Sequence, residues 1–136
     1  MSVELRTRSG QGQAGVFIGR QAETLTATIA ASAAQSNAID LHANVLVALV
    51  MPGAWTTAAL SFLGATALDG TYYPVLDDAG TEVIISSANA VAARVIVNNT
   101  ILEKLAALRF IKFRSGGVGA EVNQAAERVL TLLVKG

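Results

Sequence analysis

Apolar residues in this chain come in short bursts that alternate with polar residues and end at Gly, Pro, Asn or Asp. Residues 24–30 show the pattern clearly, because Leu, Ala and Ile at alternate positions oppose three threonines. A period of two is typical of a β-strand with one buried face. The same pattern predicts strands at residues 24–30, 44–51, 57–63, 72–76, 82–85, 92–97, 108–114 and 128–134. About eight such strands predict an all-β fold, a single antiparallel β-sandwich with jelly-roll or Greek-key-like connections.

Three segments carry additional signals. Residues 44–51 are almost all apolar, so we expect this strand to be covered on both faces. Pro74 lies within residues 72–76, and a residue without an N–H group predicts an edge strand or a bulge there. One short helix is expected within residues 99–107, where Ile and Leu have helical spacing and Thr100 is placed to act as the N-cap.

The first 22 residues differ in composition from residues 23–136, which form the predicted sandwich domain. This stretch has three arginines against one acid and is rich in Gly, Gln and Ser, so it cannot bury enough surface to fold by itself. Two interpretations are open, a frayed terminus or an extended arm that becomes ordered on a partner. The residues expected to bind a partner in the second case are Arg6, Arg8, Phe17, Ile18 and Arg20.

Composition excludes several classes of protein. Apolar types make up 52% of the chain and charged types 15%, which is too apolar for a disordered protein. The longest apolar run, residues 45–51, is much shorter than the roughly 20 residues that cross a bilayer. Acidic and basic residues balance, so we expect no membrane or nucleic-acid partner. The chain has no cysteine and no secretory signal pattern, so we expect synthesis in the cytoplasm and no disulfide.

Candidate catalytic and metal-binding residues are few. His42 is the only histidine, and we interpret it as a surface or turn residue. Asp77, Asp78 and Glu82 lack the ligand spacing of an EF-hand and predict a β-turn. Residues 116–119 are rich in glycine, but no Lys-Ser/Thr pair follows, so they predict a hairpin tip instead of a phosphate site. We therefore expect no enzymatic activity, no metal and no cofactor.

Aromatic and basic residues leave one binding alternative open. An exposed patch on which a sugar could stack would consist of Trp55, Tyr72 and Tyr73. The alternative is that the Trp55 ring plugs one end of the sandwich, which would exclude such a patch. Four basic residues lie near the C-terminal end: Arg109, Lys112, Arg114 and Arg128. They are too few to predict a nucleic-acid-binding face.

Six segments carry a family resemblance: residues 50–56, 60–62, 69–73, 76–83, 109–116 and 122–132. In these segments, which lie within residues 24–135, the chain resembles small structural proteins of tailed-bacteriophage and prophage virions. The shared residues are turns and strand starts. The segment LGATAL at residues 63–68 fits less well, because it is more apolar than an exposed loop should be, which leaves open whether this face meets a partner.

The resemblance implies a head decoration (cement) protein, located on the capsid surface of the virion and made in the host cytoplasm. The implied partner is the major capsid protein, whose neighbouring capsomers the decoration protein bridges. We expect copies to associate symmetrically, most simply as a homotrimer. Two alternatives stay open: a receptor- or carbohydrate-binding module of a tail fibre or baseplate, and a connector or tail structural subunit.

Overall fold

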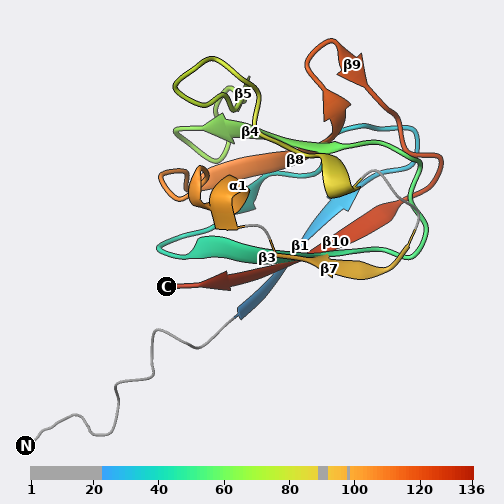
Figure 1. The fold of residues 1–136 in the computed structure, drawn as a ribbon, viewed down its shortest axis with the longest axis horizontal. Coiled ribbons are helices and arrows are strands. Elements are labelled where there is room, and N and C mark those ends of the chain that lie inside the picture. The colour runs from blue at the N-terminus through green and yellow to red at the C-terminus, as the bar shows by residue number, and fades with distance from the viewer. Residues whose placement is uncertain (1–22, 89–91, 98) are drawn as a thin grey trace, which may run out of the picture.

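Two antiparallel β-sheets packed face to face make up the computed structural model, which describes residues 23–88, 92–97 and 99–136 (Figure 1). One sheet has four strands in the order β1-β10-β3-β7, and the other has six. The bounds of the four are β1 (Glu23–Ile29), β10 (Arg128–Lys135), β3 (Val45–Met51) and β7 (Arg94–Ile96). The all-β sandwich predicted from the sequence is confirmed.

The six-stranded sheet is built around the order β2-β8-β4-β5, with β6 also pairing with β4 and β9 with β8. Its strands are β2 (Ile39–Asp40), β8 (Phe110–Gly117), β4 (Leu60–Ala65), β5 (Tyr73–Pro74), β6 (Ile84–Ile85) and β9 (Ala120–Glu121). A 3₁₀ turn (Ser86–Ala88) follows β6, and the helix α1 (Asn99–Glu103) follows β7. Among the described residues no helix is long and apolar enough to cross a membrane.

Strand pairing follows a nested scheme. β1 pairs with β10, β2 with β8, β3 with β7 and β4 with β5, so that each pair encloses the next along the chain. A long hairpin folded over on itself produces this connectivity, which is that of a jelly roll with β6 and β9 as additions. The scheme places the first and last strands side by side in the four-stranded sheet.

The core lies between the sheets because each long strand turns alternate side chains inward. On β10, Leu130, Leu132 and Val134 are fully buried, while the residues between them are not. In the facing sheet, the rings of Phe62 and Phe113 meet edge to face with their centroids 5.3 Å apart. Aromatic pairs in this geometry contribute about 0.5–1.5 kcal/mol beyond the area that they bury.

Some sequence predictions need correction in detail. The two-residue strands β2 and β9 were not predicted, because so short a pairing has no periodic signal. α1 begins at Asn99, so Thr100 lies in the first turn and is not the N-cap. β3 is not fully covered on both faces, since Val45, Val47 and Val50 are only half-buried, although the adjacent Ala48 and Leu49 are both buried. Pro74 lies in the edge strand β5, as predicted.

Candidate functional site

The three aromatic residues predicted as a possible exposed patch do not form one. Trp55 is buried in the core, and its Nε1–H donates to the carbonyl oxygen of Ala58 at 3.0 Å. Tyr72 is half-buried and donates its hydroxyl hydrogen to the carbonyl oxygen of Leu68. Only Tyr73, 66% exposed, presents its ring to solvent. Of the two interpretations left open by the sequence, the structure supports a Trp55 that fills the sandwich interior, where its single donor is satisfied.

The other predicted binding residues belong to the N-terminal arm, which lies outside the described residues. They are Arg6, Arg8, Phe17, Ile18 and Arg20.

His42 is an exposed turn residue, as predicted. Its backbone has a φ of +55°, and its N–H donates to Oδ1 of Asp40 at 2.8 Å. Asp40 also accepts two hydrogen bonds from Arg109, at 2.8 and 3.1 Å. These bonds from Arg109 hold the pKa of Asp40 at about 2, below its usual 3.8. The ion pair therefore links β2 to the residue that precedes β8, and the low pKa makes this carboxylate a weak base.

The acidic loop after β5 is a β-turn, as predicted. Oδ1 of Asp77 accepts hydrogen bonds from the N–H groups of Ala79 and Thr81, both at 2.9 Å. The bond from Thr81 is the main cause that lowers the pKa of Asp77. Within the described residues, no group of His, Asp or Glu side chains could hold a metal ion. The glycine-rich residues 116–119 form the β8–β9 hairpin, again as predicted.

A buried ion pair holds this hairpin, and sequence reasoning did not find it. Arg114 is only 5% exposed, forms an ion pair with Glu82 and donates from Nε to Oγ of Ser61 at 3.0 Å. The other carboxylate oxygen of Glu82 accepts the N–H of Val118 at 3.1 Å. These groups satisfy one another, so the cluster fixes the hairpin against the sheet. Arg114 therefore contributes nothing to a basic surface.

The other three basic residues near the C-terminal end also have individual partners. Arg109 pairs with Asp40, and Lys112 lies over the ring of Tyr72 with Nζ 4.6 Å from its centroid. Arg128 donates to the side-chain oxygen of Gln124. Each of the four basic residues is therefore engaged with a partner of its own.

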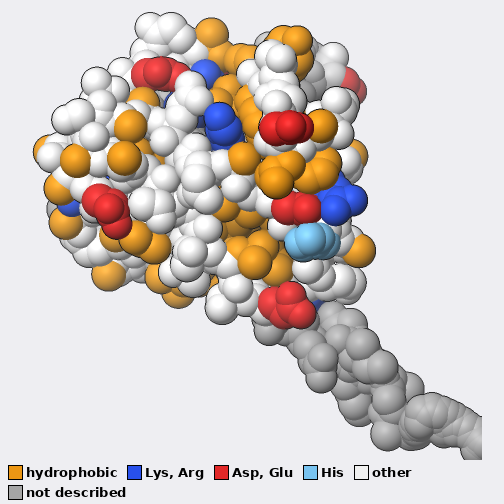
Figure 2. Space-filling view, turned by 180° about the vertical axis from the view of Figure 1, so that it is seen from behind, with side chains coloured by type: hydrophobic (Ala, Val, Ile, Leu, Met, Phe, Trp, Pro, Cys, Tyr) orange, Lys and Arg blue, Asp and Glu red, His pale blue; other side chains and the backbone are white. Residues whose placement is uncertain are grey.

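Figure 2 shows hydrophobic side chains gathered in patches over one face of the molecule, with charged side chains scattered between them. The structure has an open groove of about 340 Å³ where β4 meets the edge strand β5. Its lining carries no charged residue and consists of Gly64, Ala65, Thr66, Thr71, Tyr73, Pro74, Val75, Leu76 and Leu108. Tyr73 and Leu76 are 66% and 52% exposed, so the groove opens directly to solvent.

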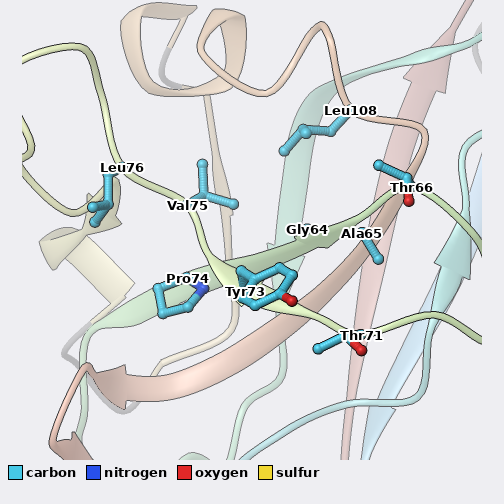
Figure 3. Close-up of a pocket in the computed structure, with 9 residues that line it drawn as sticks. All are labelled: Gly64, Ala65, Thr66, Thr71, Tyr73, Pro74, Val75, Leu76 and Leu108. Atoms are coloured by element: carbon cyan, nitrogen blue, oxygen red, sulfur yellow. The ribbon is translucent and has the colours of Figure 1, made fainter.

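The groove exists because three segments converge over a glycine (Figure 3). β4 supplies its floor, the chain from Tyr73 onward supplies one side, and Leu108 reaches in from the segment after α1. A Cβ at Gly64 would lie 3.3 Å from Leu108, so a larger residue would push that side chain outward. The apolar run at residues 63–68 was the signal in the sequence for this site, since residues 64–66 line the groove.

This arrangement suits the binding of an apolar group. The groove offers apolar carbon atoms, two threonine hydroxyls and the tyrosine ring, whereas the ion pairs of Asp40 and Glu82 hold strands in place. No family model, no curated protein and no solved structure matches this chain.

Proposed function

We propose that this chain is a bacteriophage virion structural protein, a capsid decoration (cement) protein that binds the outer shell and reinforces contacts between capsomers. The sequence resemblance is its starting point, and the observation that supports it best is the uncharged groove between β4, β5 and Leu108. A decoration protein carries out no reaction. It needs a stable scaffold with surfaces that adhere to a larger assembly.

The groove defines the chemistry of the partner. A charged side chain entering it would lose its hydration without gaining an ion pair, because the lining is uncharged. An apolar side chain of the major capsid protein would bury carbon against Leu108 and Val75. Tyr73 at the rim adds a rigid ring with a hydroxyl group, the type of residue that often anchors interfaces.

The fold adds support by analogy alone. Jelly rolls occur in viral capsid domains, and also in lectins and cupins. Because one fold serves many functions, the connectivity of the strands weighs less than the groove. The N-terminal arm is the second proposed contact, in which Phe17 anchors the arm and its arginines meet acidic patches of the shell. A carbohydrate-binding module is disfavoured, because the indole ring that it requires at the surface is buried.

The test has two stages. Particles purified from a lysate of the source bacterium are labelled with antibodies against this chain, and labelling of the head surface is expected. Purified shells are then sedimented with the full chain, with Tyr73→Ser, and with a variant that lacks residues 2–20. Both changes should reduce co-sedimentation at least tenfold.

Val118→Ser is the matched control, since Val118 is 57% exposed on the hairpin and lies outside the groove. It should bind shells as well as the unmodified chain does. Particles without this chain would overturn the virion proposal. Shell binding that is insensitive to Tyr73→Ser would overturn the role of the groove.

A further inference from the structure

β1 forms one edge of the four-stranded sheet. β10 pairs along one side of it, and on the other side only the C-terminal end of β1 has a neighbour, where Ile29 forms an isolated bridge with Ser36. The direction of its backbone groups can be read at Thr28. Its N–H donates to Oδ1 of Asn37 at 2.8 Å, and its carbonyl oxygen accepts the N–H of Asn37 at 3.2 Å. Both groups therefore point away from β10. Because backbone groups alternate along a strand, those of Thr24 and Thr26 point to the same open side.

Among the described residues, the open side of β1 has no partner at Thr24 and Thr26. Within the described part of the chain, no hydrogen bond joins the outward groups of Thr24 or Thr26 to any partner, and both residues are exposed. Proteins usually block such an edge with Lys, Pro or a bulge. β1 has the sequence ETLTATI, which contains none of these and consists mostly of residues that favour strands.

We propose that β1 pairs antiparallel with β1 of a second copy, around a two-fold axis at Leu25. Thr24 of each copy then lies opposite Thr26 of the other. Each such pair exchanges two backbone hydrogen bonds, which gives four in total. The contact is isologous, so each surface is its own complement.

The register follows from the groups that are free. A shift by one pair toward the C-terminal end would place Thr28 in the contact, but Asn37 already occupies its backbone groups. In the proposed register Glu23 lies opposite Ala27 of the second copy, so no like charges face each other.

The outer face of the sheet is compatible with the same contact. The register aligns Thr26, Thr131, Val50 and Val95 across the four strands, and none of these carries a charge. Pairing at β1 joins the two four-stranded sheets into one sheet of eight strands, and this uncharged row continues from one copy into the other. The proposed dimer differs from the homotrimer expected from the sequence. It does not depend on whether the chain is a virion protein.

Sedimentation velocity of the full chain over a range of concentrations is the first test. A species of twice 14.0 kDa is expected. Thr26→Pro removes one outward N–H group, and proline is tolerated on an edge strand at such a position. This variant should be monomeric with an unchanged circular dichroism spectrum. Thr24→Lys combined with Thr26→Lys gives a second disruption if the proline variant does not fold.

Val95→Lys is the control, because Val95 lies on the opposite edge strand and is 57% exposed. It should leave the dimer unchanged. A chain that is monomeric, a trimer, or a dimer that survives both disruptions would overturn the proposal.

Cross-linking tests the register itself. The chain contains no cysteine, so a single introduced cysteine reports a single pair. In the proposed register, Leu25 lies opposite Leu25 of the second copy in a non-hydrogen-bonded pair. The Cα atoms of such a pair are about 4.5 Å apart, which is within the range that a disulfide can bridge. Leu25→Cys should give a covalent dimer on mild oxidation, whereas Thr28→Cys should not. Equal cross-linking of the two variants would contradict the register.

Discussion

Removal of the negative charge at Glu82 should destabilise the fold strongly, because it leaves Arg114 buried without its counter-ion. The Arg114 and Glu82 side chains are only 6% and 15% exposed. Breaking a buried ion pair by removing one partner typically costs about 3–5 kcal/mol. Here Ser61 still accepts the Nε hydrogen, and Glu121 stays 3.9 Å from Nη1. We therefore expect Glu82→Gln to reduce the free energy of unfolding by about 2–4 kcal/mol.

Urea denaturation followed by tryptophan fluorescence can measure this loss, since the single tryptophan is buried and changes its surroundings on unfolding. A loss of 3 kcal/mol would lower the melting temperature by about 10 °C in a chain of this size. The control is Glu121→Gln, whose side chain is 41% exposed and whose ion pair is long. It should cost less than about 1 kcal/mol.

A double replacement shows whether the loss of stability comes from the unpaired buried charge or from the lost side-chain contacts. Glu82→Leu together with Arg114→Met removes both charges, so most of the stability lost in the single variant should return. The reasoning is refuted if Glu82→Gln costs no more than Glu121→Gln. It is also refuted if the double variant is as unstable as Glu82→Gln.

Two further predictions concern pH and a turn. The folded pKa of Asp40 is about 2 against 3.8 unfolded, so its contribution to stability is full above pH 4 and is lost as the pH falls toward 2. Urea midpoints measured between pH 5 and 2 should therefore fall less steeply for Asp40→Asn than for the unmodified chain, and parallel curves would contradict this. Gly116→Ala should destabilise by about 1–3 kcal/mol, because φ is +92° and a Cβ would lie 2.2 Å from the Ala120 carbonyl oxygen. Gly119→Ala, with open space around it, should cost clearly less in the same denaturation assay.

Periodicity predicted the long strands because their alternation records a single buried face. Residues 24–30 predicted β1 within one residue at each end, and the pattern of β10 was equally clear. The ion pair of Arg114 was not predictable, because its partner is 32 residues away and only the sheet brings them together. Leu108 was missed as a groove residue for the same reason. The sequence left the exposure of the three aromatic rings open, because exposure depends on three-dimensional packing, which the spacing of the rings does not record.

Nested pairing has a consequence for how the molecule forms. Ala27 pairs with Leu130, so closing the four-stranded sheet requires two segments more than a hundred residues apart to meet. Folds dominated by such distant contacts fold slowly, on a scale of milliseconds to seconds. While the chain is being synthesised, β1 must wait for β10 to emerge from the ribosome. During that interval both edges of β1 are open to other chains, so expression at lower temperature or with chaperones should improve the yield of folded protein.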